Sequence, residues 1–175
     1  MIGADAAGKR LIDGAATDNP WAYAFPQWSL DGERIAYHAG LPGHISDIFV
    51  AAVDGSGTEA IGDLTENLVW PVWSPDGARI AYSGPATSDG MSQIGVMDAD
   101  GTNIETLDHP SLGCNCAFGW SPDGTKVIAS QDAPVAGAGA HPALMVIDVT
   151  GSAPVGVIPS EGVTSQEASW QRLAP

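Results

Sequence analysis

The segment HPSLGCNC brings His109, Cys114 and Cys116 within eight residues of one another. Imidazole and thiolate groups are preferred ligands of zinc and related metals. A single C-x-C pair is a weak motif, however, and Cys116 also fits a small buried residue at the start of an apolar strand. We therefore keep these three residues as weak metal candidates and predict no bound metal or other cofactor.

Nucleophiles with a supporting base are not apparent in the sequence. Ser74 and Ser121 each precede a proline in a turn, without a G-x-S-x-G motif, a paired His and Asp context or a phosphate-binding loop. The segment DADG at 98–101 resembles the start of a calcium loop but lacks the later ligands and the terminal Glu. A hairpin turn explains it better, and we expect no enzymatic activity from this chain.

One hairpin sequence recurs three times, as QWSLDGERIAY at 27–37, VWSPDGARIAY at 72–82 and GWSPDGTKVIA at 119–129. Its tryptophans are 45 and 47 residues apart, and Trp170 follows Trp120 after 50 residues. A period in the forties is typical of helix pairs or of four-stranded propeller blades. Helix pairs are excluded because 22 glycines and 13 prolines interrupt the chain every few residues.

Each copy of the repeat is predicted to form four short strands, and the first strand ends in tryptophan. The turn S-[PL]-D-G closes the hairpin, so Gly77 and Gly124 are expected to have positive φ. The strands are short apolar runs, which are typical of sheets covered on both faces. We therefore expect Trp28, Trp73 and Trp120 to be buried between sheets. A sandwich of short strands is the alternative, but it does not require a hairpin at a fixed period.

The pattern W-S-P-D-G-x-[RK]-[IV]-A-[YF], followed by [IV]-x-V-M-D-A-D-G-T, closely resembles the repeat of TolB-like (WD40-like) β-propellers. Residues 73–82 and 94–102 match it best, and the resemblance covers nearly the whole chain. It implies an all-β propeller of four-stranded antiparallel blades. It does not imply one function, because such repeats serve as binding platforms, as gating domains of prolyl-oligopeptidase-type proteases and as scaffolds of some polysaccharide lyases.

Full repeat units are predicted at 24–64, 68–107 and 115–159, with partial units at 1–13 and 165–175. The first partial unit aligns with the third and fourth strands of a blade, and the last aligns with a first strand. Propellers usually have at least four blades, and open strand edges invite pairing. We therefore expect an incomplete ring, completed within a larger propeller or by another copy, and not a closed monomer.

Strand order predicts which loops share a face. The turns after the first and third strands are short and form the short-turn face. The loops after the second and fourth strands form the variable-loop face, and the longest of them is predicted at 130–142. Irregular loops on a rigid scaffold are the usual place for binding sites. The candidate binding residues on or beside this face are His38, His44, Trp70, His109, Cys114 and His141.

The charge of the chain limits its partners. The chain has six Lys and Arg residues and 21 Asp and Glu residues, which gives a formal net charge of −15 at pH 7. This charge repels polyanions, so we expect no nucleic-acid binding. A solvated acidic surface explains it most simply, and adaptation to high salt or a basic or metallic partner are the alternatives.

The sequence contains no run of 18 apolar residues, so we expect no membrane span. No signal peptide is visible at the start, which fits a cytoplasmic protein, a mature form or a fragment. We predict a periplasmic or extracellular location.

The leading functional hypothesis is a non-catalytic β-propeller scaffold that binds a protein or peptide through the variable-loop face. The first alternative is the propeller portion of a larger hydrolase or lyase, whose chemistry lies in another domain. The second is a self-assembling surface or extracellular structural unit, joined through open blade edges. Self-association is expected, and the fold alone does not decide among the three hypotheses.

Overall fold

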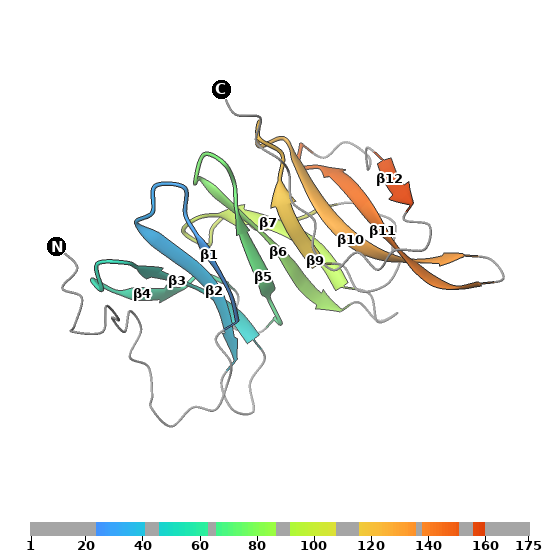
Figure 1. Cartoon of the computed structure of the whole chain (residues 1–175). Helices are drawn as coiled ribbons and strands as arrows, with labels where there is room; N and C mark the ends of the chain where they lie inside the picture. Colours follow the sequence, from blue (N-terminus) through green and yellow to red (C-terminus); the bar gives the residue numbers. More distant parts are fainter. Residues whose placement is uncertain are drawn as a thin grey trace, which may run out of the picture.

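The computed structural model describes residues 24–40, 46–62, 66–86, 92–107, 116–135, 138–150 and 156–159. Within these ranges twelve strands form three four-stranded antiparallel sheets, and no helix is present (Figure 1). The strands of each sheet follow one another in chain order, so each sheet is one blade. The predicted all-β fold with four-stranded blades is confirmed. The partial units predicted at 1–13 and 165–175 lie outside the described residues.

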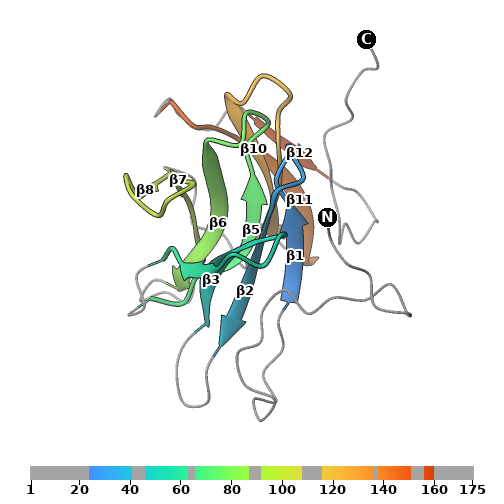
Figure 2. The ribbon, with the colours of Figure 1, turned by 90° about the vertical axis from the view of Figure 1, so that its left-hand side faces the viewer.

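The three blades lie side by side, with their first strands β1, β5 and β9 in contact (Figures 1 and 2). Blade 1 consists of β1 (Ala24–Trp28), β2 (Arg34–Gly40), β3 (Ser46–Ala52) and β4 (Thr58–Ala60). Blade 2 consists of β5 (Val69–Trp73), β6 (Arg79–Ala86), β7 (Ser92–Asp98) and β8 (Glu105–Thr106). Blade 3 consists of β9 (Cys116–Trp120), β10 (Lys126–Val135), β11 (Ala138–Asp148) and β12 (Gly156–Pro159).

The S-P-D-G turn is held by its own side chains. The Ser74 hydroxyl donates to Asp76 Oδ1 at 2.6 Å and accepts the Arg79 backbone N–H at 2.9 Å. Asp76 Oδ1 also accepts the Ala78 N–H at 3.0 Å, and Gly77 has φ of 70°. The turns at 29–34 and 121–126 repeat these contacts, and the predicted positive φ of Gly77 and Gly124 is confirmed. The serine hydroxyl is therefore a structural part of the hairpin.

Hydrogen bonds to the turn carboxylates also change their acidity. The Ser121 hydroxyl, together with the Thr125 backbone N–H and hydroxyl, lowers the pKa of Asp123 to about 2. The Ser74 hydroxyl and the Ala78 N–H likewise lower the pKa of Asp76. Because these bonds favour the ionised carboxylate, both aspartates stay charged to a lower pH than an ordinary aspartate does.

Apolar side chains fill the spaces between blades. The cluster between blades 1 and 2 consists of Ala36, Ile48, Ile61, Leu68, Trp73, Ile80, Tyr82 and Met97. The cluster between blades 2 and 3 consists of Ala81, Ile94, Val96, Leu107, Trp120, Val127, Ala129, Met145, Ile147 and Val149. The core therefore lies between the facing sheets of neighbouring blades, and each blade contributes apolar side chains to it.

The tryptophan that ends the first strand links each blade to the one before it. Trp73 donates its indole N–H to the Gln27 carbonyl at 3.2 Å, and Trp120 donates to the Val72 carbonyl at 2.9 Å. The Arg34 guanidinium lies 4.6 Å from the centre of the Trp73 ring, and the Arg79 guanidinium lies 4.9 Å from that of Trp120. Cation–π attraction therefore adds to an indole hydrogen bond at both junctions.

The arginines complete this contact at the turn of the next blade. Arg34 Nη2 donates to the Gly77 carbonyl at 3.4 Å, and Arg79 Nη2 donates to the Gly124 carbonyl at 3.0 Å. Each junction thus contains the same three interactions, and its two hydrogen bonds join residues 43 to 48 apart in the chain.

Burial of the repeat tryptophans is confirmed for Trp73 and Trp120, which are 7% and 6% exposed, but is wrong for Trp28, which is 59% exposed. The reason is the position of its blade. A tryptophan at the end of a first strand is covered by the preceding blade, and no blade among the described residues precedes blade 1.

The prediction of a long irregular loop at 130–142 is also wrong for the most part. β10 and β11 continue far beyond the blade as a paired ribbon, with register from Lys126↔Asp148 to Val135↔Ala138 (Figure 1). Pairing satisfies backbone N–H and C=O groups that an irregular segment would leave to solvent.

Trp120→Ala is expected to lower the free energy of unfolding by roughly 3–5 kcal/mol, since it removes a buried indole and both of its junction contacts. Trp28→Ala is the matched control and should cost about 1 kcal/mol or less in dilute solution, because most of its side chain is exposed. Urea denaturation followed by circular dichroism measures both values. Equal losses in the two variants would contradict the proposed role of the junction.

Candidate aromatic binding site

The first strands of blades 1 and 2 bend near their starts. Ala24 pairs with His38 and Gln27 with Ala36, so Phe25 and Pro26 face a single residue of β2. β5 repeats this bulge at Trp70 and Pro71. Proline lacks the N–H needed for a ladder bond, which favours a bulge at this position.

The residue before each of these prolines has an unusual backbone conformation. Phe25 has φ of 54° and Trp70 has φ of 53°. Non-glycine residues rarely adopt positive φ, and bulky ones do so at an energetic cost. The surrounding contacts must therefore hold these two residues in place, and they re-aim two aromatic side chains at the same end of the blades.

His38 connects the two bulges across the junction of blades 1 and 2. Its Nδ1 accepts the Trp70 backbone N–H at 3.1 Å. Its ring stacks on Phe25 with centroids 5.5 Å apart and meets Trp70 edge-on at 6.5 Å. Phe25 and Trp70 also contact each other edge-on at 5.7 Å. These distances are typical of favourable aromatic pairs, and the three residues form one aromatic cluster.

The aromatic cluster lies on the variable-loop face. Phe25 and Trp70 are the second residues of β1 and β5, and His38 lies near the end of β2. In Figure 1 these strand ends lie at the bottom, opposite the short turns after β1 and β5 at the top. Phe25 is 54% exposed, whereas His38 and Trp70 are half-buried. The cluster therefore offers an aromatic surface that a ligand can reach.

The chemistry of His38 is that of a neutral ring. Burial lowers the pKa of His38 below its usual value of 6.5. Because Nδ1 accepts a backbone N–H, the proton of the neutral ring is on Nε2. The Nδ1 lone pair is engaged with Trp70, so this nitrogen does not serve as a general base.

Of the six predicted binding residues, the structure brings His38 and Trp70 together. His44, His109 and Cys114 lie outside the described residues. His141 lies within β11, opposite Ala133, and Cys116 begins β9, opposite Ser130. The structure describes only the backbone at these two positions, so the absence of a bound metal remains a prediction.

Phe25 is the functional candidate that our sequence reasoning missed. The signal was present in the aligned segments FPQW at 25–28 and WPVW at 70–73. In each, an aromatic residue precedes a proline and lies three residues before the repeat tryptophan. The third blade has Ala117 at this position, and Ser83 and Ser130 occupy the positions equivalent to His38. The cluster is therefore specific to the first junction.

Other polar candidates are explained by the fold. Asp100 Oδ1 accepts the Thr102 N–H at 3.0 Å, and Asp98 Oδ2 accepts the Asn103 side-chain amide at 2.7 Å, so DADG closes a hairpin. No group of three or more His, Cys, Asp or Glu side chains suited to a metal ion occurs within the described ranges.

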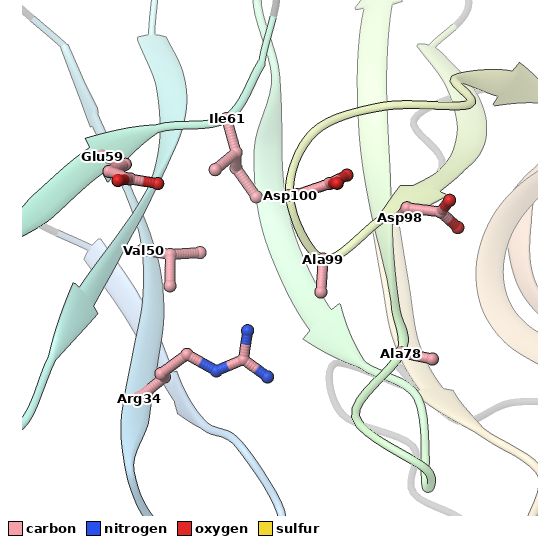
Figure 3. A pocket seen from close by; sticks show the side chains of 8 residues that line it. All are labelled: Arg34, Val50, Glu59, Ile61, Ala78, Asp98, Ala99 and Asp100. Carbon is pink, nitrogen blue, oxygen red and sulfur yellow. The ribbon is translucent and has the colours of Figure 1, made fainter.

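A hollow of about 460 Å³ lies between blades 1 and 2 at the short-turn face. It is lined by Arg34, Val50, Glu59, Ile61, Ala78, Asp98, Ala99 and Asp100 (Figure 3). Arg34, which reaches in from β2, is the cation that holds Trp73. The main polar groups of this hollow thus serve the junction and the turn, and the aromatic cluster is the better candidate site.

Sequence comparison decides the family. A sequence profile of the TolB β-propeller domain matches residues 15–171 of the chain. The chain belongs to the TolB β-propeller domain family. No curated protein matches the sequence. None of the described elements is a helix long and apolar enough to cross a bilayer.

Solved structures with the same propeller fold come from proteins of different kinds. TolB from Acinetobacter baumannii is 23% identical with a TM-score of 0.60, over 81% of this chain and 32% of that chain. The β-propeller domain of the Trilobed protease from Pyrococcus furiosus is 18% identical with a TM-score of 0.58, over 83% and 45%. Acylaminoacyl peptidase from Pyrococcus horikoshii is 16% identical with a TM-score of 0.60, over 81% and 25%.

These similarities show the fold alone, since the identities are low. The chain spans between a quarter and somewhat less than half of the length of these three proteins. Both TolB and peptidase propellers share its architecture, so the fold is compatible with each functional hypothesis.

His38 should titrate below pH 6.5 in the folded protein, with the proton of its neutral ring on Nε2. Since the folded pKa is lowered, its contribution to stability is fully present above pH 6.5 and decreases as the pH falls from there toward the folded pKa. Long-range ¹H–¹⁵N spectra across pH 5–8 measure both properties, with His38→Ala as the assignment control. A protonated Nδ1 in the neutral ring would contradict the bond to Trp70.

Proposed function

We propose that the chain is a non-catalytic β-propeller scaffold that binds a protein or peptide through its variable-loop face. The observation that carries this proposal is the aromatic cluster of Phe25, His38 and Trp70, which spans two blades on that face. Aromatic side chains offer a large contact area at low conformational cost and are enriched at the energetic centres of interfaces.

The rigidity of the cluster supports this role. Phe25 is held at positive φ by its bulge and is stacked on His38, yet more than half of it is exposed. A side chain already fixed in position loses little entropy when a partner covers it. The net charge of −15 favours a peptide segment that is neutral or basic over an acidic one.

A peptide-binding experiment tests this proposal. Peptides are selected from a random phage-displayed library on the immobilised chain, and their affinities are then measured by calorimetry. Phe25→Ala should weaken the selected peptides roughly tenfold or more, because it removes an exposed anchor. Ile104→Ala is the matched control, since Ile104 is an apolar residue with 49% exposure beside β8. Equal affinities for the wild type and Phe25→Ala, or an equal loss in Ile104→Ala, would refute the proposal.

The alternative function is that of a propeller portion of a larger hydrolase or lyase. The similarity to the Pyrococcus horikoshii acylaminoacyl peptidase and to the propeller of the Trilobed protease favours it. In that case the catalytic groups lie in another domain, and the aromatic cluster would contact substrate or the catalytic domain. The turn serines do not supply a nucleophile here, since both hydroxyls are bonded within their turns.

We expect the purified chain to show no labelling by a fluorophosphonate probe and no binding of duplex DNA. The engaged hydroxyls of Ser74 and Ser121, 1% and 4% exposed, and the charge of −15 are the reasons. Gel fluorescence and fluorescence anisotropy at low salt measure these two properties. Labelling that Ser74→Ala or Ser121→Ala abolishes, or DNA binding that weakens with added salt, would contradict this expectation.

A periplasmic or extracellular location is part of the same proposal. Its support is the membership of the TolB β-propeller domain family and the similarity to TolB of Acinetobacter baumannii. Fractionation of cells that express the full gene, with immunodetection of the chain, tests this location.

A further inference from the structure

Blade 1 has the turn and the tryptophan that a junction takes from its second blade, and we call this side of blade 1 the acceptor edge. Its turn is built like those of blades 2 and 3, with Gly32 at φ of 72° and the Arg34 N–H donated to Ser29 at 2.9 Å. Trp28 occupies the position of Trp73 and Trp120 but is 59% exposed, and Leu30 beside it is also 59% exposed. The outer part of the same face is closed, since Tyr37 is stacked on Phe49 and buried. The open part is thus the inner edge, at Trp28.

Blade 3 has the cation that a junction takes from its first blade, and we call this side of blade 3 the donor edge. Lys126 follows the turn at the position that Arg34 and Arg79 occupy in the other blades, and within this chain its ammonium donates to Thr125 Oγ1 at 3.1 Å. Leu144 and Val146 are half-buried, whereas the residues at the equivalent positions of β7, Ile94 and Val96, are 0% and 2% exposed. The apolar face that leads to the next blade is therefore partly open.

We propose that the open edge of blade 1 binds blade 3 of a second copy of this chain. The two existing junctions serve as the template. The ammonium of Lys126 lies over the Trp28 ring of the other copy and donates to the Gly32 carbonyl, as Arg34 does with Trp73 and Gly77. The Trp28 indole N–H donates to the Gly119 carbonyl of the other copy, as Trp73 does to Gln27.

Blade number favours a second copy as the occupant. Propellers close with typically four to eight blades, and three are too few. Two copies bring six described blades together, which lies within this range, and a two-fold axis then uses the blade 1 and blade 3 edges of both copies. This arrangement leaves no donor or acceptor edge over for a third copy, so association ends at the dimer.

Lysine at the donor position predicts moderate affinity. Arginine places a rigid, planar guanidinium over the indole, whereas lysine offers one flexible ammonium. Replacing Lys126 by arginine reproduces the chemistry of the two internal junctions. Lys126→Arg should therefore lower the dissociation constant of the dimer. A general loss of solubility would not explain this result.

Sedimentation equilibrium of the 175-residue chain tests the proposal through complementation. The wild type should form a species of twice the chain mass and none larger. Trp28→Ala and Lys126→Ala should each raise the dissociation constant, roughly tenfold or more for the tryptophan. Ile104→Ala, which removes an exposed side chain away from both edges, should leave it unchanged.

The mixture of the two variants is the decisive measurement. Trp28→Ala retains an intact donor edge and Lys126→Ala retains an intact acceptor edge, so an equimolar mixture regains one complete junction and associates more tightly than either alone. A mixture no tighter than the separate variants would overturn the head-to-tail pairing in favour of another interface. A wild-type chain that remains monomeric would overturn the second copy and leave a further blade of the same polypeptide as the occupant.

Discussion

The contact between a tryptophan and the arginine of the preceding blade is the interaction on which the rest of this structure depends. The described blades share no backbone ladder, so hydrophobic packing alone would let them slide or rotate against one another. The indole N–H of Trp73 and Trp120 and the arginines above their rings are directional. They fix the height and angle of each blade, and the apolar clusters then pack in one arrangement.

A single short motif supplies both sides of this contact. In W-S-P-D-G-x-R the tryptophan faces the preceding blade, and the arginine, six residues later, reaches the next one. The serine hydroxyl binds the backbone N–H of that arginine or lysine in all three turns. The turn therefore positions the cation as well as closing the hairpin, which explains why turn, tryptophan and cation recur together.

The fold could be predicted from the sequence because its main determinants are local. Turn chemistry and the tryptophan period depend on residues close together in the chain, and β1, β5 and β9 end at the repeat tryptophans as predicted. The environment of Trp28 was not predictable, since it depends on whether a blade precedes it. The aromatic cluster was found only in part, because it depends on a contact between His38 and Trp70, which are 32 residues apart. The β10–β11 ribbon was missed because its Ala- and Gly-rich sequence lacks a strand pattern.

The two junctions share their contacts at the short-turn end of the blades but not at the variable-loop end. At the short-turn end both junctions carry the same contacts, as the closure of any neighbouring pair of blades requires. At the variable-loop end the first junction has Phe25, His38 and Trp70, whereas the second has Trp70, Ser83 and Ala117 at the corresponding positions. Blade packing does not need the cluster, since the second junction is packed without it. The two strained backbone positions beside this junction are therefore consistent with the proposed binding role, which blade packing alone does not require.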